Sequence, residues 1–415
     1  MRNELELAAD KSTTIHTNPS EICNILTLRY NPKIKPLLPI KTWDRFQPDS
    51  TVLSIGDIEN SILDSLKQKI ESNKIKKISI ALSGGIDSTL ILAMLRKLFP
   101  DIEIEAITIK FAESVDESPV AAKIAQNFEA NHHIVYLENY LEELPKAISI
   151  IKMPFWDLHW YHVVKKSQSL SKYLASGDGG DELFGGYTFR YKKFLSLTTQ
   201  NSTPLDKVKA YLQCHERDRV PDQEDLFDAK AEFTWDAIYK TLLPYFDNSL
   251  PSLDQVFLAD YNGKLLYNFS PVNTRILNHF LVEGISPLLS DLIIGTATRI
   301  PNVKKYDQNK NLGKLPLREL LKKYNAISFV PDQKLGFNVD TKNLWELYGK
   351  SICTEYLLDS SIVSDGWINK KWITSHINRS DLDVRYINKF LGLLAFEIWY
   401  RLFVTRDMNA NTRLN

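Results

Sequence analysis

Residues 76–88 read KKISIALSGGIDS, and this stretch decides the fold class. Its first half is rich in isoleucine and lacks glycine and proline, which predicts a buried β-strand. Apolar residues then recur at helical spacing from Leu90 to Leu98, so we expect a helix to follow the two glycines at once and to end before Pro100. A strand, a glycine turn and a helix in this order form the first half of a βαβ unit.

The same alternation continues along the chain. Further strands are predicted at residues 102–111, 132–137 and 172–175, and further helices near 121–128, 140–152 and 158–171. Strands that alternate with helices form parallel sheets with right-handed crossover connections, so we expect an α/β fold.

Beyond residue 190 the pattern changes to helices and long loops. We therefore divide the 415 residues into a lead-in segment over 1–54, an α/β core over 55–190 and an α-rich part over 191–415. The longest apolar stretch, residues 390–404, contains Glu397 and Arg401 and is shorter than the ~20 residues that span a bilayer. It predicts a buried helix near the C-terminus.

The composition argues against several function classes. Lys plus Arg and Asp plus Glu both number 51, whereas a chain that wraps nucleic acid usually carries a basic excess. The three cysteines are isolated in sequence, which argues against a zinc ribbon, an iron–sulfur cluster or a disulfide framework. We expect a cytoplasmic protein that binds neither nucleic acid nor membrane.

The glycine turn of the opening stretch has the chemistry of an anion site. Gly84 and Gly85 allow the backbone to approach a ligand closely, and amides of the turn and of the helix start point toward negative charge. Ser83 and Ser88 add hydroxyl donors, and the Asp87 carboxylate is suited to hold Mg²⁺ against phosphate oxygens. Because no lysine follows the glycines, the turn is not a Walker A loop.

A second glycine-rich stretch, SGDGGDELFGGY at residues 176–187, follows the last predicted strand. Ligands in open α/β sheets bind beyond the carboxyl ends of the strands, so both stretches are expected to face one site. Asp87 from the first and Asp181 from the second are then placed to share Mg²⁺ on a pyrophosphate group. The glutamate that ends an EF-hand calcium loop is missing at the required spacing.

Together the two motifs resemble those of the asparagine synthetase family, whose synthetase domain belongs to the PP-loop ATP pyrophosphatases. The resemblance covers about residues 55–405 and implies a parallel sheet of the adenine nucleotide α-hydrolase type. Further matching residues are Pro154, Asp157, the loosely matching Glu283, Pro287 and Leu289, and the Lys-x-Gly-Phe loop at Lys334, Gly336 and Phe337.

The resemblance also implies a reaction. A carboxylate, with aspartate the favoured substrate, attacks the α-phosphate of ATP, and ammonia or another amine then displaces AMP. ATP and Mg²⁺ are the implied cofactors. Asp178 would position or deprotonate the amine, and the positive charge of Lys334 would stabilise negative charge on the α-phosphate. The residues whose main-chain groups would contact adenine are Leu82, Ile109, Ser176 and Gly177.

The chain also departs from this family. Members that use glutamine begin with a glutaminase domain whose cysteine nucleophile follows the initiator methionine, but Arg2 stands in that place and the lead-in segment is too short for such a domain. We therefore expect ammonia, free or from a separate glutaminase subunit, as the nitrogen source. Ile285 and Ser290 replace an arginine and an aspartate, and Asp332 stands where an arginine often occurs. These changes leave the acyl substrate open.

Three other functions remain open. A related synthetase could form a different amide or a ring, as β-lactam synthetases and lasso-peptide cyclases do. The neutral net charge argues against a tRNA-modifying ATP pyrophosphatase. The presence of Asp87, Asp181 and Lys334 argues against a catalytically silent scaffold subunit.

His159 and His162 share a helical face, but two imidazoles without a third ligand do not predict a metal site.

Overall fold

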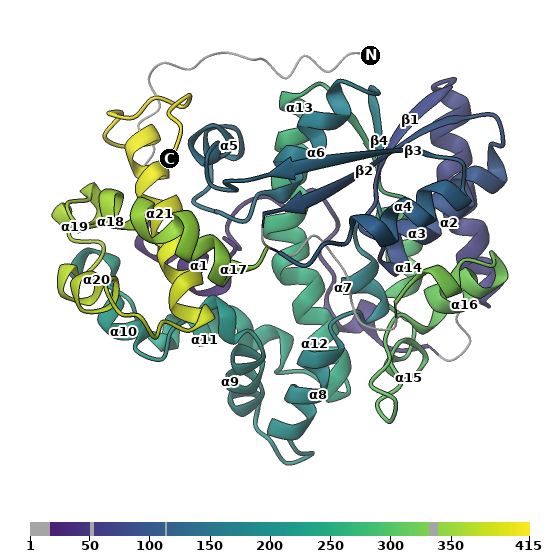
Figure 1. Cartoon of the computed structure of the whole chain (residues 1–415). Coiled ribbons are helices and arrows are strands. Elements are labelled where there is room, and N and C mark those ends of the chain that lie inside the picture. The colour runs from purple at the N-terminus through teal and green to yellow at the C-terminus, as the bar shows by residue number, and fades with distance from the viewer. Residues whose placement is uncertain (1–16, 50–53, 113, 332–338) are drawn as a thin grey trace.

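The computed structural model describes residues 17–49, 54–112, 114–331 and 339–415. Within them, five parallel strands form one sheet in the order β3–β2–β1–β4–β5 (Figure 1). The strands are β1 Lys77–Ala81, β2 Glu103–Phe111, β3 Asn131–Leu137, β4 Tyr173–Ala175 and β5 Glu283–Ile285. The α/β fold with a parallel sheet, expected from the sequence, is confirmed.

Helices cover both faces of the sheet, because alternate side chains of a strand point to opposite faces. In β2, Ile104 and Ala106 belong to one hydrophobic core and Ile107 and Ile109 to another. The first core includes residues of α2 Ile55–Ser72, α3 Ile86–Leu98 and α4 Ser118–Asn127. The second includes residues of α5 Leu144–Ile151, α6 His159–Gln168 and α13 Ser270–His279.

The chain between β4 and β5 is almost entirely helical. Its elements before α13 are α7 Gly180–Phe184, α8 Thr188–Leu197, α9 Pro204–Cys214, η2 Glu216–Asp218, α10 Gln223–Leu226, η3 Ala229–Ala231, α11 Trp235–Leu242, η4 Leu243–Tyr245, α12 Ser252–Asp260 and η5 Tyr261–Phe269. Much of this insertion forms the lower lobe in Figure 1, away from the strands.

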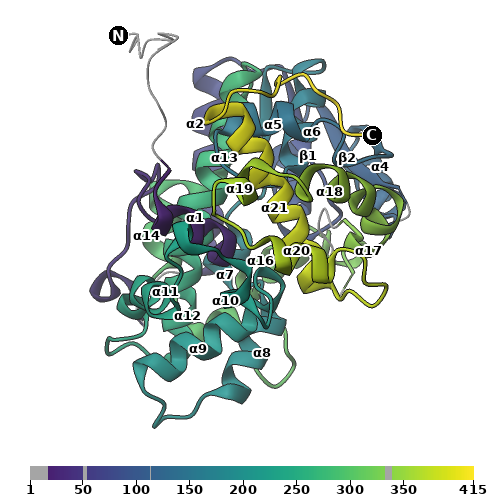
Figure 2. The same cartoon turned by 90° about the vertical axis from the view of Figure 1, so that its left-hand side faces the viewer.

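The part after β5 is also helical. Its elements are η6 Pro287–Leu289, α14 Asp291–Ala297, α15 Asn302–Lys305, α16 Leu315–Lys323, η7 Ile327–Phe329, α17 Thr341–Leu344, η8 Trp345–Gly349, α18 Lys350–Leu357, α19 Ser361–Ser364, α20 Lys370–His376 and α21 Val384–Phe403. The buried α21 confirms the helix predicted near the C-terminus. It packs against α1 Pro19–Leu28, α18 and α19 (Figure 2). Among the described residues, no helix is long and apolar enough to cross a membrane.

α2, β5 and the helices of the lead-in segment were not predicted from the sequence. β5 has only three residues, including Gly284, and it is a strand because its backbone pairs with β4 across a long sequence separation. The lead-in segment contains α1, which begins at an Asn18 cap and buries seven consecutive residues, with η1 Trp43–Phe46 after it. A helix buried on all sides lacks the amphipathic pattern by which helices are recognised.

Glu105 joins three neighbouring strands of the sheet. Its carboxylate lies 2.6 Å from Nζ of Lys77 on β1 and 2.5 Å from Nε2 of His133 on β3. Burial by itself would raise the pKa of Glu105, but the hydrogen bonds from Lys77 and His133 lower it to about 2. The ionised form therefore stabilises the folded sheet.

We expect Glu105→Gln to lower the free energy of unfolding by about 1–3 kcal/mol at pH 7. Because the folded-state pKa lies below the ordinary value of 4.5, this contribution is present above that value and is lost as the pH falls toward 2. Urea unfolding at pH 7 and pH 3 measures both effects. Glu103→Gln, on a side chain that is 52% exposed, is the control, and an equal loss in both variants would contradict the assignment.

Candidate active site

The two glycine-rich motifs lie next to each other because β1 and β4 are neighbouring strands. Leu82 follows β1 directly, and Ser176 and Gly177 follow β4. Ile109 lies near the carboxyl end of β2, on the other side of β1. The four residues expected to contact adenine are therefore gathered at the carboxyl edge of three adjacent strands.

The first motif forms a turn that leads into α3. Gly84 has a φ of 71°, a left-handed conformation that favours glycine, and Gly85 is the N-cap of the helix. Since Gly85 has no side chain, no side chain caps the first turn of α3, and its amides can bind an anion. The hydroxyls of Ser83 and Ser88 lie 3.4 Å apart and line the same turn. This geometry suits a phosphate group.

The second motif packs on the first without a gap. A Cβ atom at Gly180 would lie 2.3 Å from Cγ of Asp87, and one at Gly177 would lie 2.6 Å from Cβ of Asp87. Real Cβ atoms do not approach this closely, so both positions require glycine. The expectation that the two motifs face one site agrees with this contact.

We expect Gly180→Ala to lower ATP–pyrophosphate exchange by about 10²-fold or more, because the new methyl group displaces the Asp87 carboxylate. Gly295→Ala, in α14, is the matched control, since a Cβ there meets nothing within 4 Å and alanine favours a helix. Exchange assays and thermal melts on both variants test this. Full exchange activity in Gly180→Ala would contradict the prediction that exchange requires the Asp87 carboxylate in this position.

The carboxylates of Asp87 and Asp181 converge on one cation, the ammonium of Lys314. Nζ of Lys314 lies 2.5 Å from Oδ2 of Asp87 and 2.7 Å from Oδ1 of Asp181. Burial would lower the pKa of Lys314, but Asp181 and Asp87 raise it above its usual value. The ammonium therefore stays charged, and the predicted pair of carboxylates is brought together.

Sequence reasoning missed Lys314. It is the N-cap of α16, and its amide donates to the carbonyl of Phe184 in the second motif at 3.1 Å. The preceding Gly313 sits so close that a Cβ there would lie 2.1 Å from the carbonyl oxygen of Gly185. Contacts across the fold, these with the second motif among them, bring Lys314 into the site, and the sequence around it carries no local motif.

The donor set fits Mg²⁺. This ion is usually held by one or two carboxylates together with phosphate oxygens and water, and Asp87 and Asp181 supply two carboxylates at a point that already favours positive charge. No cluster of three or more His, Cys, Asp or Glu residues suited to a metal occurs among the described residues. The described residues therefore do not indicate a metal ion that is bound by protein side chains alone.

Asp178 belongs to the second motif and contacts α13. Nδ2 of Asn273 on α13 donates to Oδ2 of Asp178 at 3.2 Å. Burial raises the pKa of Asp178, while hydrogen bonds to Ser176 and Asn273 oppose the rise. A carboxylate with a raised pKa is a better proton acceptor, which agrees with the predicted role in deprotonating an amine.

The predicted Lys334, with the loop around it and Asp332, lies outside the described residues, so its role stays a prediction. Ile285 is buried in β5 and offers no charge to a ligand, and Ser290 caps α14 by accepting a hydrogen bond from the amide of Ile293. At these two positions, where the chain departs from the family pattern, Ile285 therefore packs in the core and Ser290 caps a helix.

The sequence of this chain is similar to known proteins over most of its length. The family model for asparagine synthase matches residues 58–401. Glutamine-hydrolyzing asparagine synthetase 1 of Bacillus subtilis (strain 168) is 24% identical over an alignment of 392 residues, gaps included, and the alignment covers 85% of this chain and 60% of that protein. Putative glutamine-hydrolyzing asparagine synthetase 2 of Methanocaldococcus jannaschii is 32% identical over an alignment of 131 residues, gaps included, that covers 30% of this chain and 25% of that protein. The chain spans less than two thirds of the length of these relatives.

Two solved structures also align. NMN synthetase from Francisella tularensis covers 55% of this chain and 93% of its own, with 12% identity and a TM-score of 0.27. The U34-tRNA thiolase NcsA from Methanococcus maripaludis covers 57% and 86%, with 14% identity and a TM-score of 0.26.

Proposed function

Because the chain belongs to the asparagine synthase family, we propose that it joins a carboxylic acid to an amine nitrogen with ATP, releasing AMP and pyrophosphate. The observation that carries the proposal is the convergence of Asp87, Asp181 and Lys314 beside the uncapped first turn of α3. Such a group of charges and amides suits a pyrophosphate with its metal ion.

In this proposal each part of the site acts on a different charge. The amides at the start of α3 and the ammonium of Lys314 hold the pyrophosphate that leaves when the acid attacks the α-phosphate. Mg²⁺, held by Asp87 and Asp181, would neutralise charge on the same phosphates. Asp178 accepts the proton that the amine loses in the second step, and Lys334 contributes positive charge near the α-phosphate.

Aspartate and ammonia are the substrates that we propose first, giving asparagine. This choice rests on the family and on the named relatives, which are asparagine synthetases. The acid could instead be another carboxylate, joined to another amine or to an amine of its own, since Ile285 and Ser290 differ from the residues expected at those positions.

The test uses purified protein with ATP, Mg²⁺ and labelled pyrophosphate, screened against aspartate and a panel of other carboxylic acids. We expect exchange of label into ATP only with the acid that is adenylated, and AMP and amide once ammonia is added. If no acid supports exchange but the protein cleaves ATP when a tRNA is added, the tRNA-modifying alternative would replace this proposal.

Glutamine is expected not to replace ammonia in the purified chain of 415 residues. A glutaminase needs a reactive thiolate, but Cys23, Cys214 and Cys353 are all buried. Burial raises the pKa of both Cys23 and Cys214 to about 12. Glutamate release measured with and without Cys23→Ser checks this. Release that disappears in the variant would contradict the prediction and identify a nucleophile.

A further inference from the structure

A cavity of about 540 Å³ lies between the lead-in segment and the end of α14, and none of its lining residues belongs to the two glycine motifs. The lining residues are Lys41, Asp44, Arg45, Gln47, Pro48, Asp49, Gly295 and Arg299. A Cβ atom at Gly295 would meet nothing within 4 Å, so the space beside α14 is open. Small-molecule sites have volumes of this size, and most of the lining side chains are polar or charged. The cavity therefore suits a polar ligand of several atoms.

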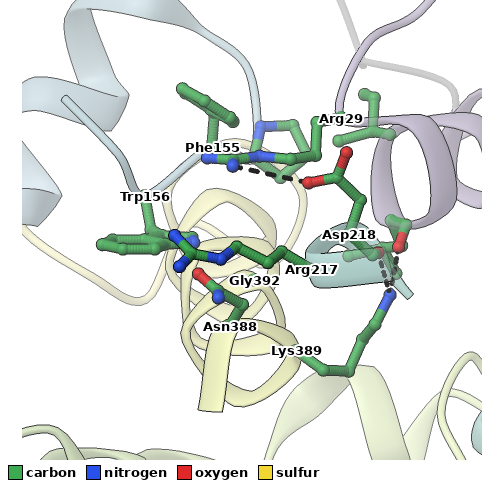
Figure 3. A pocket seen from close by; sticks show the side chains of 11 residues that line it. Arg29, Phe155, Trp156, Arg217, Asp218, Asn388, Lys389 and Gly392 are labelled. Carbon is green, nitrogen blue, oxygen red and sulfur yellow. Dashed lines mark hydrogen bonds and ion pairs between the residues drawn. The ribbon is translucent and has the colours of Figure 1, made fainter. Parts of the chain in front are cut away.

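A second cavity is too small for such a ligand. It has a volume of about 30 Å³, and Arg29, Asp218 and Lys389 are among the residues that line it (Figure 3). Nζ of Lys389 donates to the carbonyl of Asp218 at 3.0 Å and to that of Leu26, so two of its three N–H donors are engaged. The volume is about that of one water molecule in the liquid. Of these two cavities, the larger one suits a ligand.

The walls of the larger cavity are held by contacts between segments far apart in the sequence. Asn262 of η5 accepts a hydrogen bond from the amide of Lys41 at 3.1 Å and donates one to its carbonyl at 2.7 Å. The amide of Asp49 donates to the carbonyl of Arg299 at 2.9 Å, and Nη2 of Arg299 lies 2.6 Å from Oδ2 of Asp49. Between these two points the side chain of Phe46 is buried. Because the walls are fixed in this way, binding of a ligand requires little further ordering of the chain.

The positive charge in the cavity is only partly paired. Arg299 pairs with Asp49, but neither Lys41 nor Arg45 forms an ion pair with a residue that the structure describes. Burial lowers the pKa of Lys41, and the charge of Arg45 lowers it further because like charges repel. Asp44 is the remaining carboxylate of the lining, and its lowered pKa keeps it ionised. Two cations beside one carboxylate leave a net positive charge in the cavity.

We propose that this cavity binds the oxyanion group of a small molecule, either a phosphate or a pair of carboxylates, between Lys41 and Arg45. The planar guanidinium of Arg45 matches two oxygens of such a group, and the ammonium of Lys41 supplies a point charge with three donors. The side-chain amide of Gln47 adds a neutral hydrogen-bond donor to the same cavity. An anion in this place also offsets the repulsion between the two cations. The site goes beyond the proposed function and does not depend on it.

The test uses the full chain, with inorganic phosphate and malonate as probes and chloride as the control for ionic strength. We expect at least one probe to bind with a dissociation constant below about 1 mM in calorimetric titrations. Binding of phosphate alone indicates a phosphorylated ligand, and binding of malonate alone indicates a dicarboxylate. Lys41→Gln combined with Arg45→Gln should weaken this binding by about 10-fold or more. Lys35→Gln is the matched control, because Lys35 is exposed in the same segment but does not line the cavity.

Two further variants separate this site from other effects. Phosphate also suits the turn that opens α3, and Ser88→Ala should weaken binding at that turn while leaving binding in the cavity unchanged. Lys41→Arg combined with Arg45→Lys keeps both charges and should bind several-fold more tightly than the pair of glutamines. The proposal is overturned if neither probe binds, if the pair of glutamines binds as the wild type does, or if Lys35→Gln loses as much binding as that pair. A loss as large in the variant that keeps both charges would also overturn it. Absence of ATP–pyrophosphate exchange would overturn the proposed function and leave this site standing.

Discussion

Asp87→Asn and Asp181→Asn are each expected to lower ATP–pyrophosphate exchange by at least about 10³-fold while leaving the fold intact. Asparagine keeps the size of the side chain and an oxygen that accepts a hydrogen bond from Lys314. It removes the charge that holds Mg²⁺ against the leaving pyrophosphate. Exchange rates and circular dichroism spectra of the two variants test this.

Asp381→Asn is the matched control for these variants. Its ion pair with Arg379 lies on the surface, with the aspartate side chain 71% exposed, so the same chemical change is expected to have no effect on exchange. Near wild-type exchange in either Asp87→Asn or Asp181→Asn would contradict a site built on two carboxylates. Exchange that returns at high Mg²⁺ concentration would instead support weakened metal binding.

Lys314→Met is expected to destabilise the protein by about 3 kcal/mol and to abolish exchange. Methionine keeps an unbranched stem of similar length, but the carboxylates of Asp87 and Asp181 then face each other without the ammonium between them. Because the pKa of Lys314 is raised, its stabilising charge is present at all pH values below its ordinary value of 10.5 and is lost only at more alkaline pH. Urea unfolding at pH 7 measures the loss.

Two measurements distinguish this effect from lost packing. Lys314→Met combined with Asp181→Asn should regain more than half of the lost stability, because one of the two facing charges is gone, yet remain inactive. Mg²⁺ should raise the melting temperature of Lys314→Met more than that of the wild type, since the ion can bind between the carboxylates. If neither change stabilises the variant, the two carboxylates do not share a cation.

The parts of the site that the sequence predicts are those with local patterns. The turn of residues 83–88 follows an apolar strand and opens a helix, so its anion-binding geometry could be predicted from adjacent residues alone. Asp181 could be paired with Asp87 because parallel strands end at one edge of a sheet. Lys314 could not be predicted, because its contacts reach residues 227 positions away and depend on how α16 docks.

The same reasoning explains why β5 was missed. β5 is a strand because of its pairing with Tyr173, Leu174 and Ala175, and its own three residues carry no strand pattern.

The ammonium between the two carboxylates has a consequence for synthesis of the chain on the ribosome. Both glycine motifs and four of the five strands precede residue 190, but Lys314 emerges more than a hundred residues later. Until then Asp87 and Asp181 repel each other across a contact that has no room for a side chain at Gly180. Contacts with such separation slow folding, so the nascent sheet must wait for its last strand and its cation. Free Mg²⁺ in the medium is expected to speed refolding, because the ion can bind between Asp87 and Asp181 before Lys314 reaches them.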